Sequence, residues 1–580
     1  MLRLSRIKLP TTFIAIFISL AVIPFSYGAE KVTDPNQGWV IPIESGALGS
    51  QNALFTDRSS DDRDYSALLD ISKSGDNQVD ITCDSAADLK CSESNQLIYY
   101  AQLPICQNST SKNCIVSLVA FDTLGKAYPA NFSRYFPNRA QNQFEGDPSI
   151  NLPSGGAGSL FTIPGVDGPA GNMYYVSFIM SGEVTSHKQT TLGSVHASIF
   201  PVQLQDDQRF DGWKFCLSPS KTCDTGWNKL DAGNGKFIWN ESGSQGTNCA
   251  ETSWAEKLCA AKEAFPIGFS YALKVRLSLA PSGWLHGRMT NPEISIVQTG
   301  DVTELNVAAS PVTVPTVYKH FQWNEMPSEL QELYDPNTGK YKNSHGEGFS
   351  NTVVITSNPA ERAWTTAPSP YSPTAISELN AWLPHVNDRA TVIPSFWSFR
   401  SLSEGELKSA NKCFSDSSRL NGIVTTNSTA YSPGPPEFDK VNGDLNYRVA
   451  APHYLPNGID TFRGTYDLVM QSPVARCIYG FSNAPIKGTV SVVSSNGTPQ
   501  VATTVVSEKN GWLSLRAYNF EFSSPTVTVS LVQEASASSS VLPGATKVVQ
   551  VKSTIKCYKG KLTKSVTSVK PKCPIGYKLK

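Results

Sequence analysis

Residues 174–180, Tyr-Tyr-Val-Ser-Phe-Ile-Met, are almost all aromatic, β-branched or long aliphatic. A short apolar run of this kind is typical of a strand at the centre of a sheet. Apolar and polar residues alternate strictly over 273–279, and they alternate again over 527–531. Period-two alternation indicates one buried and one exposed face, as in antiparallel sheets. The sequence therefore predicts a mainly β protein.

Turn and helix signals agree with this class. Two alternating runs between residues 490 and 506 flank Asn496-Gly497, the dipeptide that most strongly favours a tight hairpin turn. Helical patterns are few and short. The strongest covers 251–265, and weaker ones cover 328–334, 375–383 and 404–412.

These patterns predict two antiparallel β-sandwich-like domains with short helical insertions, plus a small disulfide-stapled C-terminal hairpin. The expected boundaries are 35–310 for the first β-rich domain and 318–533 for the second. Residues 308–317 contain Pro311 and Pro315 and are expected to form an extended connector. A Ser/Ala linker, 534–545, is expected to lead to a cationic two-cysteine tail, 546–580.

The N-terminus predicts export. Three basic residues before position 9 precede an apolar run over 12–24, and small residues stand at Ser26 and Gly28. This arrangement is typical of a secretory signal peptide, here residues 1–28. The alternative is an uncleaved anchor, but a spanning helix needs roughly 20 apolar residues. We therefore expect a secreted, extracellular chain with no transmembrane segment after cleavage.

The twelve cysteines support the same location. An even number in an exported chain predicts a disulfide framework, and pairing in sequence order is the simplest solution. The expected pairs are Cys83 with Cys91, Cys106 with Cys114, Cys216 with Cys223, Cys249 with Cys259, Cys413 with Cys477, and Cys557 with Cys573. The alternative is zinc, which prefers closer pairs supported by histidine. We expect no metal and no cofactor.

Charge is divided unevenly along the chain. The formal net charge is +0, but no acidic residue follows Glu534, and ten of the 49 basic residues are lysines in the tail. Such a tail attracts polyanions. The candidate binding lysines are Lys556, Lys559, Lys561, Lys564, Lys570 and Lys572. The expected partner is an anionic cell-envelope polymer or polysaccharide; nucleic acid is not expected, because of the compartment. The alternatives are a solvated solubility tail or a sorting signal removed after secretion.

The tail also resembles a lysine-rich, two-cysteine C-terminal module of secreted actinobacterial proteins, of the form I-x-C-x-K-G-K-x-T-K-x-V-T-x-V-x-P-K-C-P-x-G-Y-K. The second domain is similar to one found in such proteins through the stretches 397–402, 424–428, 466–470, 475–481 and 506–513. Together the resemblance covers roughly the last 260 residues. It implies a family of uncharacterised secreted proteins and carries no catalytic residue with it.

Tryptophan is concentrated in the first domain. Trp213, Trp227, Trp239 and Trp254 lie near four cysteines, and they are candidate sugar-stacking residues. The alternative is that these rings fill the cores of small loops. No His-Glu-x-x-His helix and no Gly-x-Ser-x-Gly elbow is present in the sequence, so no catalytic residue is predicted.

The function expected from the sequence is that of a secreted or cell-surface, non-enzymatic binding or structural protein. Its β-domains would bind or act as spacers, and its tail would associate with the envelope. The alternative is a secreted polysaccharide hydrolase or a lectin-like carbohydrate binder. An enzyme would need a pocket where two carboxylates, or a serine and a histidine, converge with perturbed pKa values.

Overall fold

The structure is a computed structural model. It describes residues 49–57, 66–70, 81–91, 94–137, 143–169, 171–206, 214–215, 229–231, 237–239, 249–253, 256–335, 339–341, 364–408, 410–414, 416, 418–482, 486–493, 499–500, 503–522, 526–533, 553–560, 562–568 and 572–579. The chain divides into two compact units, Met1–Gln533 and Glu534–Lys580. The predicted signal peptide and the Ser/Ala linker lie outside the described residues. The mainly β class predicted from the sequence is confirmed.

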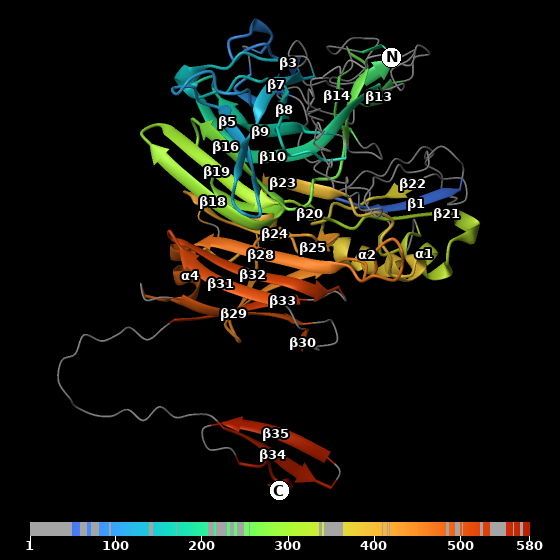
Figure 1. The fold of residues 1–580 in the computed structure, drawn as a ribbon. Coiled ribbons are helices and arrows are strands. Elements are labelled where there is room, and N and C mark those ends of the chain that lie inside the picture. The colour runs from blue at the N-terminus through green and yellow to red at the C-terminus, as the bar shows by residue number, and fades with distance from the viewer. Residues whose placement is uncertain are drawn as a thin grey trace, which may run out of the picture. The chain divides into compact units, whose positions relative to one another are not determined.

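The first unit is organised around a 16-stranded sheet (Figure 1). Along its main path the strands are, in spatial order, β3 (Ile81–Thr82), β2 (Ala67–Asp70), β4 (Gln96–Gln102), β9 (Met173–Thr185), β10 (Gln189–Asp206), β23 (Ser395–Ser401), β17 (Gly283–Arg288), β24 (Leu420–Thr426), β28 (Arg463–Gln471), β32 (Trp512–Glu521) and β31 (Thr503–Lys509). Strands β7 (Asn131–Phe136), β8 (Gly158–Thr162), β14 (Cys249–Ser253), β15 (Leu258–Lys262) and β20 (Val312–Thr313) pair with it off this path.

Strand β9 is central to this sheet because another strand pairs with it on each side and both of its faces are buried in hydrophobic clusters. It pairs with β4 on one side and with β10 on the other. Residues 174–180 are all buried. Val176, Phe178 and Met180 point into one core, and Tyr175 points into another on the opposite face. This double burial explains why the run lacks the polar alternation of a half-exposed strand.

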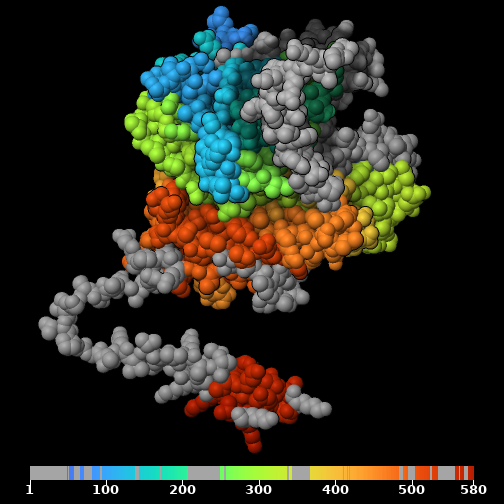
Figure 2. Space-filling view, in the orientation of Figure 1, coloured from blue at the N-terminus to red at the C-terminus, as the bar shows by residue number. Residues whose placement is uncertain are grey.

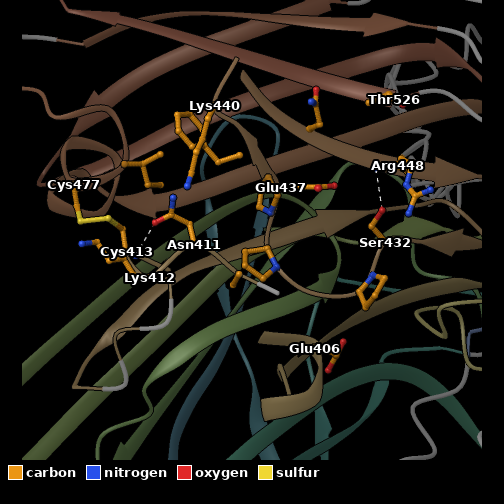
Figure 3. Close-up of a pocket in the computed structure, with 17 residues that line it drawn as sticks. Glu406, Asn411, Lys412, Cys413, Ser432, Glu437, Lys440, Arg448, Cys477 and Thr526 are labelled. Atoms are coloured by element: carbon orange, nitrogen blue, oxygen red, sulfur yellow. Dashed lines mark hydrogen bonds between the residues drawn. A yellow bond between two sulfur atoms is a disulfide. The ribbon is translucent and has the colours of Figure 1, made fainter. Parts of the chain in front are cut away.

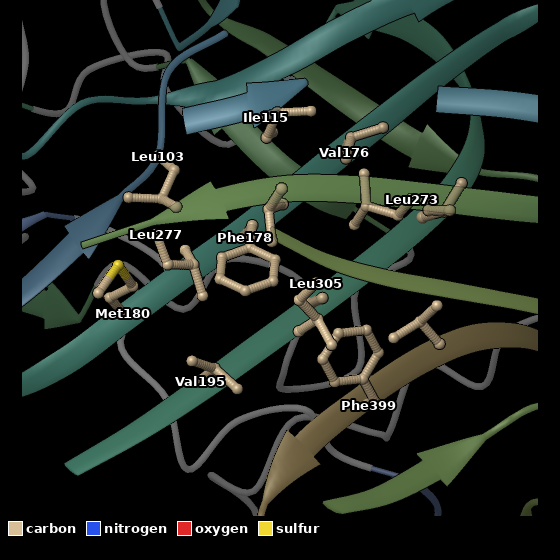
Figure 4. Packing of buried hydrophobic residues seen from close by; sticks show 14 of the residues in the cluster. Leu103, Ile115, Val176, Phe178, Met180, Val195, Leu273, Leu277, Leu305 and Phe399 are labelled. Atoms are coloured by element: carbon tan, nitrogen blue, oxygen red, sulfur yellow. The ribbon is translucent and has the colours of Figure 1, made fainter. Parts of the chain in front are cut away.

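A five-stranded sheet covers one end of the large sheet. Its strands are β18 (Thr290–Thr299), β19 (Val302–Ser310), β16 (Phe269–Leu277), β5 (Cys114–Asp122) and β6 (Ala127–Pro129). Leu273 and Leu305 from this layer pack in one cluster with Phe178, Val195 and Phe399 of the large sheet (Figure 4). The alternation of apolar and polar residues over 273–279 therefore arises because one face of this layer packs against the large sheet.

A second layer covers the other end. It contains β25 (Ala430–Tyr431), β26 (Glu437–Asp439), β27 (Asp444–Ala450), β33 (Thr526–Gln533), β29 (Ile486–Val493) and β30 (Pro499–Gln500). Tyr447 and Val529 pack against Leu468 and Leu515 of the large sheet. Val492 and Val493 of β29 pair with Gln500 and Pro499 of β30, so the predicted antiparallel pairing around Asn496-Gly497 is confirmed at this point. The second predicted run continues as β31, which pairs with β32 in the large sheet and not with β29.

The two packed layers share one sheet, and the expected division at residues 310–318 does not separate them. Strand β23 lies between β10 and β17, and β17 pairs in parallel with β24. The expected connector is extended, but β20 within it pairs with β23. In the space-filling view, green chain that includes β16 to β19 lies directly against orange chain that includes β24 to β33 (Figure 2). Residues on both sides of the expected boundary thus form one compact unit.

The short helices lie mainly beside a three-stranded sheet of β21 (Val317–Gln322), β1 (Ser50–Phe55) and β22 (Trp364–Thr366). Helices α1 (Ser328–Leu333) and α2 (Ala375–Trp382) fall within the predicted ranges and pack Leu330 and Trp382 in one core with Phe55. Helix α3 (Glu404–Leu407) is shorter than predicted, and α4 (Ser472–Tyr479) was not predicted. A separate small sheet contains β11 (Lys214–Phe215), β12 (Lys229–Asp231) and β13 (Phe237–Trp239).

The strongest helix prediction, 251–265, is wrong. Strands β14 and β15 form a hairpin there, and β15 continues the sheet by pairing with β10. A left-handed residue, Lys257 (φ 55°), lies just before β15. The Cys249–Cys259 disulfide links the two strands. Pairing with a long neighbouring strand therefore overrides the helical propensity of alanine, glutamate and lysine.

Five of the expected cysteine pairs are disulfides in the structure: Cys83–Cys91, Cys106–Cys114, Cys249–Cys259, Cys413–Cys477 and Cys557–Cys573. Cys216 and Cys223 lie outside the described residues. No described helix is long and apolar enough to cross a membrane.

The second unit is a small three-stranded sheet of β35 (Leu562–Ser568), β34 (Ser553–Lys559) and β36 (Lys578–Leu579). Among the residues of this unit whose burial is described, Cys557 is the buried one, and it forms the disulfide with Cys573. Leu562, Ile575 and Leu579 are exposed. Because so little apolar surface is covered, the disulfide is the main covalent restraint on a module that is too small for its own core.

Candidate functional site

An open cleft of about 1140 Å³ lies on the first unit beside β27 (Figure 3). This volume exceeds the range for sites that hold one small molecule, roughly 300–1,000 Å³. Four segments form the cleft, and they are distant in sequence. The lining residues come from 406–413, from 432–448, from the end of α4 at Cys477 and Ile478, and from Thr526.

The cleft walls are fixed by contacts behind them. The Cys413–Cys477 disulfide joins the 406–413 segment to α4. The proline-rich segment 432–436 is held at Ser432 and at Gly434. The backbones of Ser432 and Arg448 are joined by a hydrogen bond, and Gly434 lies so close to α3 that an added Cβ would be 2.4 Å from the carbonyl oxygen of Glu406. The cleft is therefore preformed.

One wall is the outer face of the second layer. Along β27, Leu445, Tyr447 and Val449 are buried, whereas Asn446 and Arg448 point outward. The outward residues lie opposite Thr528 and Thr526 of β33. Thr528 donates a hydrogen bond to the Asn446 side chain at 2.8 Å. This wall therefore presents hydroxyl and amide groups together with one guanidinium group.

The charge of the cleft is predominantly positive. Lys412, Lys440 and Arg448 contribute cations, and Glu406 and Glu437 contribute carboxylates. Lys440 and Arg448 are exposed, and neither forms a side-chain ion pair with another described residue. Glu406 is already neutralised, because Arg400 donates to both of its carboxylate oxygens at 2.8 Å. Lys412, Lys440 and Arg448 therefore outnumber the one remaining carboxylate, Glu437, and the lining keeps a net positive charge.

Glu406 itself is a structural carboxylate. It caps α3 in a reciprocal pair with Ser403, in addition to binding Arg400. Burial opposes its ionisation, but the hydrogen bonds and the charge of Arg400 outweigh burial and hold the pKa of Glu406 below its ordinary value. A general acid of a glycosidase needs the opposite shift. Glu406 is thus poorly suited to donate a proton to a substrate in this cleft.

A buried aromatic and cationic cluster lies at the shared sheet, with Arg400 at its edge. The His286 ring stacks on Tyr431 with 3.9 Å between ring centroids. Arg288 lies over the same tyrosine at 4.7 Å and donates to Asp57 at 2.8 Å. Arg400 lies over the ring of Tyr371 at 3.8 Å. Burial, together with the charges of Arg288 and Arg400, holds the pKa of His286 well below its ordinary value. The side chains of this cluster pack β17, β23 and β25 against one another.

Two other buried carboxyl groups have raised pKa values, and neither lines the cleft. Burial raises the pKa of Asp467, although Tyr518 donates to it at 2.6 Å and Thr425 at 3.2 Å. Burial also raises the pKa of Glu378, which accepts hydrogen bonds from Thr374 and Tyr334. Each is enclosed by hydrogen-bond donors within a core, so each serves to join elements.

The second unit carries the cationic residues predicted from the sequence. Lys556, Lys559, Lys564 and Lys572 are exposed, and Lys561 and Lys570 lie outside the described residues. Strand register places Lys564 opposite Cys557, whereas Lys556 lies opposite Ser565. Because neighbouring residues of a strand point to opposite faces, these lysines lie on both faces of the sheet.

The predicted tryptophan site falls largely outside the described residues. Trp213, Trp227 and Trp254 lie outside them, and only the backbone of Trp239, in β13, is described. The cleft, in contrast, includes no residue that sequence reasoning proposed as a ligand contact. One local feature of the sequence could have indicated a wall of this cleft. The segment Ser432–Pro436 contains prolines and a glycine directly after two strand residues, a composition typical of a rigid surface loop.

The described residues contain no group of three or more His, Cys, Asp or Glu side chains able to hold a metal ion. Comparison with protein-family models, with curated proteins and with solved structures finds no match for this chain.

Proposed function

We propose that this chain is a secreted or cell-surface binding protein, and that its C-terminal module attaches it to an anionic polymer of the cell envelope. The single observation that carries the proposal is the second unit. It is a disulfide-linked sheet with exposed lysines on both faces, and no acidic residue follows Glu534. The five disulfides of the described residues are consistent with an oxidising compartment.

A positive field without local neutralisation attracts flexible polyanions more than it selects one structure. Lysine heads are strongly hydrated point charges, so they suit many phosphate and carboxylate groups along a polymer. The first unit contains more acidic than basic residues, so its overall charge does not attract an anionic polymer. We extend the proposal to family membership, because the module resembles those of secreted actinobacterial proteins.

The test uses the full-length mature protein on isolated cell envelopes over a series of salt concentrations. A tail variant changes Lys556, Lys559, Lys564 and Lys572 to glutamine and keeps the disulfide. A matched control variant changes four exposed or half-buried lysines of the first unit instead: Lys126, Lys188, Lys319 and Lys509.

We expect the wild type and the control variant to bind and to be released as salt screens the charges. The tail variant should remain in solution at low salt. Equal retention of the tail variant and the control would contradict the proposal, and so would failure of all three proteins to bind.

A further inference from the structure

We propose that the cleft beside β27 binds a segment of an acidic saccharide chain, with Lys440 and Arg448 pairing with its anionic groups. This inference concerns the first unit and does not depend on the function proposed for the tail. It commits to a linear, hydroxyl-rich ligand that carries carboxylate or phosphate groups.

The size and openness of the cleft favour a chain over a compact molecule. Its volume of about 1140 Å³ is bounded by four separate segments, and its wall continues along the outer face of β27 and β33. An open cleft of this size can hold several units of a chain. A small molecule would leave much of this volume filled with water.

The lining matches the chemistry of a saccharide. Asn411, Asn446, Ser432 and Thr526 present side chains that can both donate and accept hydrogen bonds, as sugar hydroxyl groups require. Pro433 and Phe438 add apolar surface between the polar groups, which suits the apolar faces of sugar rings.

The charge distribution selects an acidic chain. Lys440 and Arg448 lie on opposite sides of Glu437 in the view of Figure 3, and neither is paired with another described side chain. Glu406 cannot offset them because Arg400 neutralises it. An arginine guanidinium binds a carboxylate or phosphate through two hydrogen bonds, so Arg448 is expected to provide geometric selectivity.

The rigid walls make binding less costly in entropy. The disulfide at Cys413 and Cys477, the capping of α3, and the close approach of Gly434 to Glu406 all restrain the lining before a ligand arrives. Preorganised sites lose less conformational freedom on binding.

The test measures binding of the full-length protein to soluble oligogalacturonates, from dimer to octamer, by calorimetry. Neutral oligosaccharides of equal length, glycerol-phosphate oligomers and an oligoglutamate peptide provide the comparison arms. The cleft variant is Lys440→Gln with Arg448→Gln. The control is Lys126→Gln with Lys188→Gln, which removes the same charge outside the cleft lining.

We expect acidic saccharides to bind with affinity that rises with length and then levels off. The cleft variant should bind roughly three- to tenfold more weakly for each cation removed, and the control should bind like the wild type. If the oligogalacturonates bind more tightly than the glycerol-phosphate oligomers, the cleft prefers carboxylate groups; the reverse order identifies phosphate groups.

Three outcomes would overturn the inference. Neutral oligosaccharides binding as tightly as acidic ones would remove the role of the two cations. Oligoglutamate binding as tightly as the saccharides, with the same sensitivity to the cleft variant, would assign the cleft to acidic peptides. Loss of saccharide binding in the tail variant but not in the cleft variant would place the site on the second unit.

Discussion

His286 and Tyr431 stack face to face in the interior, with ring planes only 2° apart and centroids 3.9 Å apart. His286 belongs to β17 and Tyr431 to β25, so the stack joins the large sheet to the second layer. The Nε2 atom of His286 has no hydrogen-bond partner within the described part of the chain. Arg288 lies over the same tyrosine, which further disfavours an imidazolium ion at this position.

Replacing His286 with phenylalanine should reduce the acid sensitivity of folding. The pKa of folded His286 lies below the ordinary value of 6.5, so the unfolded chain binds the extra proton first. The contribution of His286 to stability is therefore fully present above about pH 6.5 and is lost as pH falls, by up to about 1.4 kcal/mol per pH unit. His286→Phe should flatten this slope in urea unfolding measured across acidic pH. An unchanged slope would contradict the assignment.

The pair of His453 and Asp388 should give the free energy of unfolding the opposite dependence on pH. Nδ1 of His453 and a carboxylate oxygen of Asp388 are 2.6 Å apart, and this hydrogen bond raises the pKa of His453 above 6.5. The stabilisation is present below about pH 6.5 and is lost as pH rises through the raised value. Both side chains are partly exposed, so Asp388→Asn should cost less than about 1 kcal/mol just below pH 6.5, where His453 is charged. The same unfolding series should show this loss vanishing at alkaline pH.

Breaking the Arg400–Glu406 pair should be strongly destabilising. Glu406→Gln keeps a residue that can cap α3 but leaves the buried charge of Arg400 without its carboxylate. We expect a loss of about 3–5 kcal/mol in the free energy of unfolding. The double variant Arg400→Met with Glu406→Leu removes both charges and should lose less than the single variant. A loss under about 1 kcal/mol for Glu406→Gln would show that the pair is not a buried ion pair in solution.

Removing the disulfide at the cleft should lower the free energy of unfolding more than removing a disulfide that closes a short loop. Cys413 and Cys477 are 64 residues apart, whereas Cys83 and Cys91 are 8 apart. Loop entropy then predicts losses of about 4 and about 2.5 kcal/mol when each pair is changed to serine. Denaturant unfolding of the two double-serine variants tests the order. Equal losses would indicate that strain or residual structure in the unfolded chain decides the effect.

Substituting Gly434 should disturb the cleft directly. Its φ of 82° is left-handed, and an added Cβ would meet the Glu406 carbonyl oxygen at 2.4 Å. Gly434→Ala should therefore displace the 432–436 segment and cost about 1–3 kcal/mol. Gly443→Ala is a control for left-handed strain alone, since its φ is 72° and nothing lies within 4 Å of the added Cβ. Greater loss in Gly434→Ala, measured by thermal unfolding, is the expected result.

Much of the strand content could be predicted because it depends on neighbours along the chain. The alternation over 273–279 and 527–531 requires only that successive side chains point to opposite faces. The hairpin around Asn496-Gly497 depends on two residues that favour left-handed backbone. Local cysteine pairs close short loops, so their partners lie within reach in sequence.

The order of strands, the helix error and the cleft could be decided only by the tertiary structure. Residues 251–265 have helical propensity. Pairing with strand β10, which lies about fifty residues earlier in the chain, nevertheless makes them strands. Strand β23 enters between β10 and β17 from beyond the expected boundary, which no local pattern records. Glu406, Arg448 and Thr526 meet in one cleft for the same reason. The sequence alone determined the mainly β class and the strands with clear apolar alternation, since the period of a strand is local. Which strands pair, and which polar groups converge, depends on burial between distant segments.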